Sequence, residues 1–104
     1  KQYLQNKGYE ILHSNWRTGH KEVDIIAKMG NEIVFVEVKA CQSSTYRSPI
    51  EAVDVKKQKR LIEAAELFLE ASTLEYELRF DVIGIVFYKE KYEIEHIVAA
   101  FSGF

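Results

Sequence analysis

The sequence predicts an α/β protein in which helices flank a mixed β-sheet. Two observations carry this prediction. Short runs rich in β-branched and apolar residues have the patterns of strands, and they lie on both sides of a long amphipathic helical stretch. The resulting order of elements is α-β-β-β-α-β-β. We expect one domain over residues 1–104, because this length is typical of a single domain.

The first helix is short at the start of this sequence. Residues 1–7 have the pattern of the end of an amphipathic helix, so we expect a helix truncated at its N-terminus. Gly8 suits the left-handed conformation that follows many helices. The strands predicted after it are Tyr9–Trp16, Val23–Lys28, Ile33–Lys39, Leu78–Tyr88 and Tyr92–Val98.

A second helix is predicted to begin in the stretch S-P-I-E. Ser48 can cap this helix, Pro49 suits its first position, and Glu51 can reach back to the cap. The helix should then run to about Ala71. Its apolar stripe at a period of 3.6 contains Val53, Leu61, Ala64, Ala65 and Phe68.

The composition excludes several classes of protein. A single cysteine, Cys41, cannot form an internal disulfide, which favours a reducing compartment, and we expect the cytoplasm. No run approaches the roughly 18 apolar residues that a membrane span needs. The net charge of -2 argues mildly against indiscriminate nucleic-acid binding, although it does not exclude a local basic patch.

Four charged residues lie at the outer end of a predicted hairpin. Gly30-Asn31 is a signal for a two-residue turn. The register that follows places Asp24 opposite Glu37 and Glu22 opposite Lys39, on one face of the sheet. The other face is apolar and must pack on a helix; its residues are Val23, Ile25, Ala27, Val34, Val36 and Val38.

Opposed carboxylates need a compensating positive charge, because like charges directly across a sheet are destabilising. Lys39 supplies one such charge, and a divalent cation would supply more. Mg²⁺ prefers hard oxygen ligands such as Asp24 and Glu37. A lysine beside the cation can orient a water molecule and stabilise charge on a phosphate. The group therefore suits phosphodiester hydrolysis; the alternative is a solvated strand edge, which is the usual place for charged residues.

Four blocks of sequence, in order, resemble a known family. They are E-V-D-I-I-A, V-F-V-E-V-K, K-Q-K-R-L-I-E-A-A-E-L-F-L and R-F-D-V-I. Together they resemble the YraN-like family of uncharacterised bacterial proteins. That family is similar to archaeal Holliday junction resolvases, within the D-(D/E)-x-K superfamily of restriction-endonuclease-like nucleases.

The resemblance implies a nuclease that depends on Mg²⁺ or Mn²⁺ and acts on DNA, including branched DNA. Carried over, Asp24, Glu37 and the main-chain carbonyl of Val38 would be metal ligands. Lys39 would position the attacking water. Glu22 would be either an outer partner or an alternate ligand. A homodimer follows by analogy only, because symmetric cutting of a four-way junction needs two sites.

The sequence departs from the related families at three points. The resolvases carry a further acidic residue on the first helix, and this sequence starts after that point. Lys21 stands where glycine is usual before Glu22. Cys41 stands where an arginine is common, and this change would remove a phosphate contact; a small buried cysteine is its simplest meaning.

Basic residues near the predicted site are candidates for contacts with DNA phosphates. Lys57 lies on the helix stripe, where it either extends along the core into water or reaches the active face. Lys56, Lys59 and Arg60 form either a solvated helix face or a local basic patch. Arg17 is either a phosphate contact or a surface arginine.

The sequence leaves two other functions open. A nucleic-acid-binding or scaffolding module with a nuclease fold is the main alternative. A nuclease for single-stranded DNA or RNA is the other. Such proteins stack bases on exposed aromatic residues, and Tyr46 is the one aromatic residue in the loop before the long helix.

Arg79 and Asp81 in the last long apolar strand are expected to pair for structural reasons, because buried charges need partners.

Overall fold

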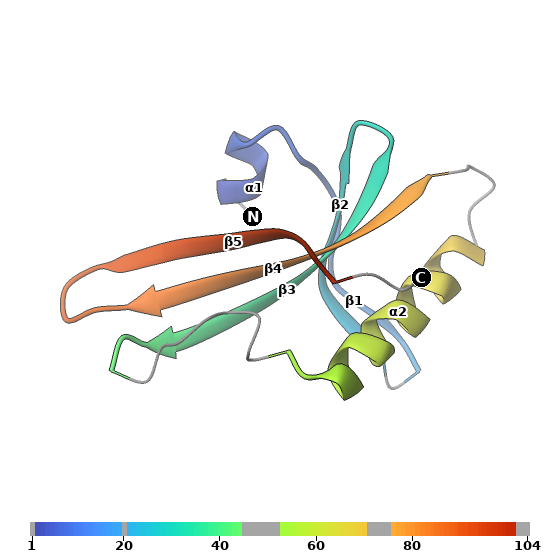
Figure 1. Ribbon diagram of the computed structural model, residues 1–104. Helices are drawn as coiled ribbons and strands as arrows, with labels where there is room; N and C mark the ends of the chain where they lie inside the picture. The colour runs from blue at the N-terminus through green and yellow to red at the C-terminus, as the bar shows by residue number, and fades with distance from the viewer. Residues whose placement is uncertain (1, 20, 45–52, 71–75, 102–104) are drawn as a thin grey trace.

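The protein is a five-stranded mixed sheet with two helices in the described part of the chain (Figure 1). The computed structural model describes residues 2–19, 21–44, 53–70 and 76–101. The elements are α1 (Gln2–Asn6), β1 (Glu10–Thr18), β2 (Lys21–Met29), β3 (Glu32–Gln42), α2 (Val55–Glu70), β4 (Glu77–Phe87) and β5 (Tyr92–Phe101). The predicted order of elements is confirmed, and it agrees with the restriction-endonuclease-like fold that the resemblance implies.

The strands lie in the sheet in the order in which they occur in the chain. β1, β2 and β3 are neighbouring antiparallel strands, whereas β3 and β4 are parallel because α2 carries the chain back to the start of the sheet. β4 and β5 are again antiparallel, as predicted. Figure 1 shows the β1–β2 hairpin crossing the β3–β4–β5 strands at a steep angle, which reflects a strong sheet twist.

Two apolar clusters hold the helices on the sheet. On the α2 side, Leu61, Ala64 and Ala65 are buried with Phe35 and Phe80. The other cluster joins Leu4 of α1 to β2, β3 and β4; its buried members are Leu4, Tyr9, Ile25, Ala27, Val34, Val36 and Ile83. Each fully buried large apolar side chain contributes about 1.5–3 kcal/mol to folding, so these clusters dominate the stability.

The apolar face of the β2–β3 hairpin packs on α1 as predicted, except at Val23. Val23 was expected on the same face as Ile25 and Ala27, but it lies in the α2-side cluster with Ile26. Asn15 on β1, between the pairs Ser14–Ile25 and Trp16–Val23, has a left-handed backbone with φ 54°. The alternation of faces along β2 therefore changes at Asp24, where this irregularity lies.

Helix α2 begins later than predicted. Ser48, Pro49 and Glu51, the predicted start, lie outside the described residues, and α2 starts at Val55. The reason is Asp54, whose Oδ1 accepts a hydrogen bond from the backbone N–H of Lys57 at 2.8 Å. An aspartate is a strong N-cap, so it sets the helix start here. The predicted stripe is otherwise correct, and Val53 is buried although it precedes the helix.

The predicted hairpin register is confirmed near the turn and wrong at the far end. Gly30 has φ 58°, and Met29 pairs with Glu32. The described ladder between β2 and β3 ends at Ile25–Val36. Beyond that point β2 continues along β1, whereas β3 continues along β4. The predicted pairs Asp24–Glu37 and Glu22–Lys39 are therefore not ladder pairs, because the twist separates the strands there.

Both outer strands of the sheet are irregular. Asn15 on β1 and Ala99 on β5 are the two non-glycine residues of the described chain with positive φ, at 54° and 51°. The β1–β2 register shifts between Ile11 and His13, and the β4–β5 register shifts after Phe80. Both edges of the sheet thus deviate from a regular strand.

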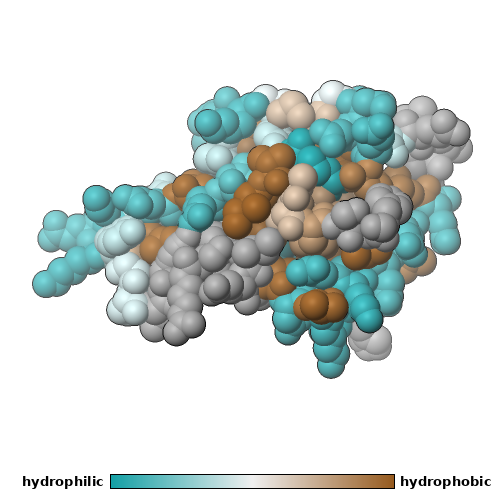
Figure 2. Space-filling view, in the orientation of Figure 1, coloured by the Kyte–Doolittle hydropathy of each residue, from teal (hydrophilic) through white to brown (hydrophobic). Residues whose placement is uncertain are grey.

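The surface is mainly hydrophilic over the helices and at the outer end of the strands (Figure 2). Apolar atoms on this face gather between α1 and α2, over the sheet. No helix in the described part of the chain is long and apolar enough to cross a membrane.

Candidate functional site

Asp24 and Glu37 come together where β2 and β3 separate. They lie in a pocket of about 210 Å³ between the two strands and the first turns of α2. The residues that line it are Lys21, Glu22, Asp24, Glu37, Lys57, Arg60 and Leu61. The divergence of the strands creates the pocket, because space opens on the sheet where the two backbones no longer pair.

Asp24 bridges the gap between the two strands. Its Oδ2 accepts a hydrogen bond from the backbone N–H of Val38 at 2.8 Å. Val38 lies beyond the last ladder pair of β2 and β3. A carboxylate thus satisfies a strand donor, since a buried backbone N–H without a partner is costly. One oxygen of Asp24 is engaged in this way, and the residue also lines the pocket.

Glu37 is a buried carboxylate with two lysine partners. Its side chain is 5% exposed. The Nζ of Lys57 lies 2.7 Å from its Oε1, and the Nζ of Lys39 lies 3.5 Å from the same oxygen. A buried charge needs such partners, because leaving it unpaired costs several kcal/mol. Lys57 therefore reaches the pocket that contains Asp24 and Glu37, instead of only extending along the core into water.

The environment of Lys57 keeps this side chain charged. Partial burial lowers the pKa of its ammonium, but the hydrogen bond to Glu37 and the negative charges of Glu37 and Asp24 outweigh that effect, so the pKa lies above its usual value. Lys57 is thus a cation at neutral pH. The site holds positive charge against the two carboxylates before any ligand arrives.

Of the remaining predicted residues, some line the pocket and others lie outside its lining. Arg60 and Glu22 line the pocket. Arg17 forms an exposed ion pair with Glu22 at 3.6 Å, which contributes little to stability. Lys56 is exposed on α2 beside Lys57 and is not among the lining residues.

Sequence reasoning missed two features of the site. Lys21 lines the pocket and pairs with Glu63 at 3.5 Å, although the sequence suggested only that it replaces a glycine. A second pocket of about 390 Å³ lies on the other side of Asp24 and is lined by Ser14, Asn15, Asp24, Ile25 and Val38. The left-handed Asn15 sits in that lining. Asparagine adopts a left-handed backbone conformation more readily than most residues, but no sequence pattern indicated that Asn15 would do so.

The donor set fits a hard divalent cation. Asp24, Glu37 and the carbonyl of Val38 would supply oxygen ligands only, which Mg²⁺ and Mn²⁺ accept together with water and substrate phosphate. The described residues contain no group of three His, Cys, Asp or Glu side chains that could hold a metal ion. Cys41, two residues beyond Lys39, is half-buried.

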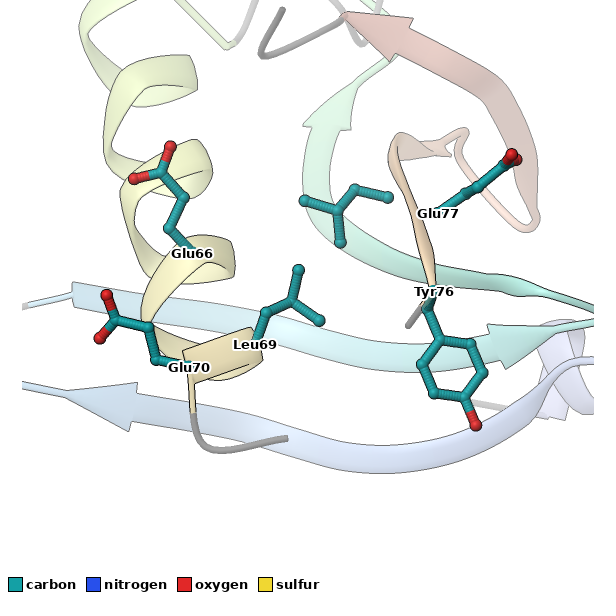
Figure 3. Close-up of a pocket in the computed structure, with 6 residues that line it drawn as sticks. Glu66, Leu69, Glu70, Tyr76 and Glu77 are labelled. Carbon is teal, nitrogen blue, oxygen red and sulfur yellow. The ribbon is translucent and has the colours of Figure 1, made fainter. Parts of the chain in front are cut away.

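A larger pocket lies elsewhere in the described chain. It has a volume of about 820 Å³ and lies at the C-terminal end of α2; its lining residues are Glu66, Leu69, Glu70, Tyr76, Glu77 and Leu78 (Figure 3). Position 66 is roughly 13 Å along the helix axis from Lys57, at about 1.5 Å per residue. Its lining has three carboxylates and no basic residue, so a phosphate would be repelled there.

A second charged cluster is structural, as predicted. Both Nε and Nη2 of Arg79 donate hydrogen bonds to Asp81 at 2.9 Å. Asp81 also lies 2.7 Å from Nε2 of His96, and Arg79 contacts Glu32 and the hydroxyl of Tyr9. Asp81 is almost fully buried, and every one of these groups has a partner. The cluster joins Tyr9, which precedes β1, to β3, β4 and β5 rather than forming an open site.

Comparisons with known proteins match the part of the chain that contains the pocket around Asp24 and Glu37. A family model described as "Uncharacterised protein family UPF0102" matches residues 1–85, a range that includes every residue of the pocket around Glu37. A UPF0102 protein of Bacteroides thetaiotaomicron is 41% identical over 99 residues, which cover 95% of this chain and 82% of the relative. Similar proteins of Chlorobium chlorochromatii and Alkaliphilus metalliredigens are 46% and 45% identical, over 95% and 96% of this chain and 81% and 88% of their own lengths.

Proposed function

This chain belongs to the uncharacterised protein family UPF0102, and from the residues of the pocket around Glu37 we propose that it is a metal-dependent endonuclease that hydrolyses phosphodiester bonds in DNA. Membership of the family confirms the resemblance seen in the four sequence blocks. The observation that carries the proposal is the convergence of Asp24 and Glu37, from two diverging strands, on one pocket with Lys57 and Arg60.

The chemistry follows from the types of residue in the pocket. Asp24, Glu37 and the carbonyl of Val38 would hold Mg²⁺ or Mn²⁺, with Glu22 as an outer partner. The bound cation would supply positive charge to offset the negative charge that develops on the phosphate. Lys39, 3.5 Å from Glu37, would hold a water molecule in line with the phosphorus and stabilise its deprotonated form.

The basic side chains around the pocket suit a phosphate backbone. Lys21 and Arg60 line the pocket, and Arg17 and Lys56 lie beside its lining residues Glu22 and Lys57. Such contacts position DNA without reading its sequence. Branched DNA is the substrate that the family resemblance implies, and a dimer with two such sites would cut a four-way junction symmetrically.

Metal binding is the first test of the proposal. Calorimetric titration of Mn²⁺ should show one site in the parent, lost in Asp24→Asn because a neutral amide is a much weaker ligand than a carboxylate. Glu10→Gln is the matched control, since it removes an exposed carboxylate of β1. Equal binding by the parent and Asp24→Asn would remove Asp24 from the metal site.

Cleavage is the second test. Lys39→Ala should bind Mn²⁺ as the parent does but cut a panel of branched and linear DNAs about 10²–10⁴-fold more slowly, the usual size of a general acid–base contribution. Lys89→Ala removes an exposed lysine and should cut at the parental rate. Parental cleavage by Lys39→Ala would refute the role assigned to Lys39.

A non-catalytic nucleic-acid-binding module is the second candidate. The ion pairs of Glu37 with Lys57 and Lys39 support this candidate, because the two lysines neutralise the buried carboxylate without any metal ion. This candidate predicts DNA binding that is independent of divalent cations and no Mn²⁺ site in the calorimeter. The Mn²⁺ titration and the cleavage assay together therefore separate the candidates.

A further inference from the structure

We propose that Lys57 is an exchangeable counter-ion of Glu37: a divalent cation binds Glu37 by displacing the Lys57 ammonium, which then turns toward the phosphate side of the pocket. The inference rests on the proposed function, because it concerns the same cation site. It assigns Lys57 a role in controlling access of the cation, in addition to any contact with DNA.

The contact geometry puts the ammonium where a metal ligand is needed. Lys57 Nζ lies 2.7 Å from Glu37 Oε1, which is the distance of a charge-assisted hydrogen bond. Lys39 approaches the same oxygen only to 3.5 Å. Lys57 is therefore the principal neutralising partner of a carboxylate that is 95% removed from solvent, since 5% of its side chain is exposed.

A divalent cation and this ammonium exclude each other at Glu37. Both need the carboxylate oxygen, and two cations held within a few ångströms of one another repel strongly where solvent screening is weak. If the ammonium left without a replacement, Glu37 would remain buried and unpaired, which is costly. Exchange avoids both penalties, because one positive partner of Glu37 replaces the other.

The surroundings allow the side chain of Lys57 to move while its backbone stays in place. The backbone N–H of Lys57 is fixed by the Asp54 cap at 2.8 Å. Its side chain is 36% exposed and lines the open pocket with Lys21 and Arg60. A displaced ammonium therefore has a path toward these two residues, where it adds a further positive charge for a phosphate.

Calorimetric titration with Mn²⁺ of four proteins tests the exchange: the parent, Lys57→Met, Lys57→Arg and Lys59→Met. Removing the competing ammonium should tighten Mn²⁺ binding by about tenfold in Lys57→Met. Lys57→Arg keeps a competing cation and should bind Mn²⁺ about as the parent does. Lys59→Met removes an exposed charge of the same helix and should also match the parent, which excludes a general effect of net charge.

Each result decides the question. Parental affinity or weaker binding in Lys57→Met overturns the exchange while leaving the metal site intact. Failure of Mn²⁺ to bind any of the four proteins overturns the proposed metal site itself and the exchange with it. Tightening in Lys59→Met equal to that in Lys57→Met also overturns the exchange, because net charge alone would then explain it.

A second measurement covers the case in which Lys57→Met does not fold. In the parent, saturating Mg²⁺ should shift the side-chain Cε–Hε NMR resonance of Lys57, because its ammonium leaves Glu37. The resonance of Lys59 should stay in place. An unchanged Lys57 resonance at a Mg²⁺ concentration that saturates the calorimetric site overturns the exchange.

Discussion

A network of paired side chains on the face opposite α2 stabilises the buried charges of Arg79 and Asp81. Asp81 accepts hydrogen bonds from Arg79 and from the backbone N–H of Ala99, and it contacts His96. The hydroxyl of Tyr9 completes the set of partners around Arg79. Fully paired buried networks of this kind specify one arrangement of strands, whereas loss of one member leaves another unpaired.

Tyr9 gives this network a predictable dependence on pH. Burial, together with the charge of Asp81, raises the pKa of the Tyr9 hydroxyl above its ordinary value of 10.0, although Arg79 opposes the shift. A raised pKa in the folded state means that the unfolded chain loses this proton first as pH rises. The contribution of Tyr9 to stability is therefore complete below about pH 10 and declines above it.

Tyr9→Phe should show both parts of this contribution. At pH 7 it should lower the free energy of unfolding by about 1–2 kcal/mol, because Arg79 loses a buried partner. Between pH 9.5 and 11 the stability of Tyr9→Phe should fall less steeply than that of the parent. Urea unfolding at each pH measures this, with Tyr92→Phe, an exposed tyrosine, as control. Parallel pH profiles for the parent and Tyr9→Phe would contradict the assignment.

At the scale of elements, Asp24 joins two strands that no longer pair. Its carboxylate replaces a ladder partner for Val38 at the point where β2 turns away with β1. The same carboxylate is a proposed metal ligand. Two substitutions of Asp24 can separate its hydrogen bond to Val38 from its proposed binding of a metal ion. Asparagine keeps an oxygen acceptor for Val38, whereas alanine does not.

Asp24→Ala should lower the free energy of unfolding by about 1–2 kcal/mol, because it leaves a strand N–H unsatisfied. Asp24→Asn should lie within about 0.5 kcal/mol of the parent, since the hydrogen bond survives. Urea unfolding without divalent cations measures both. Equal destabilisation by the two substitutions would show that the charge of Asp24, rather than its hydrogen bond, stabilises the strands.

Local signals predicted the elements well but not the way they separate. Gly30-Asn31 fixed the hairpin register near the turn, because turn chemistry acts over two residues. The divergence beyond Ile25–Val36 depends on the twist of the whole sheet, which no local pattern encodes. The start of α2 was misplaced because the prediction used the S-P-I-E signal, whereas the side chain of Asp54, further along the chain, caps the helix.

The structure brings the two predicted carboxylates together, with partners that the sequence did not indicate. Asp24 and Glu37 do share a pocket, although they are not paired across a ladder. The ion pair between Lys57 and Glu37 spans 20 positions of sequence and arises from the docking of α2 on the sheet. Helix periodicity alone could place Lys57 on the apolar stripe but could not name the residue it meets.

At the scale of the molecule, a net charge of -2 surrounds a pocket whose three carboxylates are balanced by three basic residues. Lys21, Lys57 and Arg60 are the lining residues that a DNA phosphate would contact under the proposed function. Binding that depends on phosphate contacts weakens as salt rises, in proportion to the number of contacts. Salt dependence therefore reports how many of these residues touch the backbone.

Arg60→Ala should reduce the slope of log K against log salt concentration by about 1, as expected for one lost phosphate contact. Fluorescence anisotropy with branched DNA in the Lys39→Ala background, which should not cut, measures the slope. Lys89→Ala in the same background should leave the slope unchanged. An unaltered slope in Arg60→Ala would place the DNA elsewhere on the surface.

The irregular outer strands have a consequence for behaviour at high concentration. β1 and β5 each leave one side of their backbone without a neighbouring strand in the sheet, and such edges invite other chains to add on and form aggregates. Left-handed Asn15 and Ala99 interrupt these two edges, together with the register shifts beside them. A growing fibril needs a straight, regular template, and neither edge of this protein offers one.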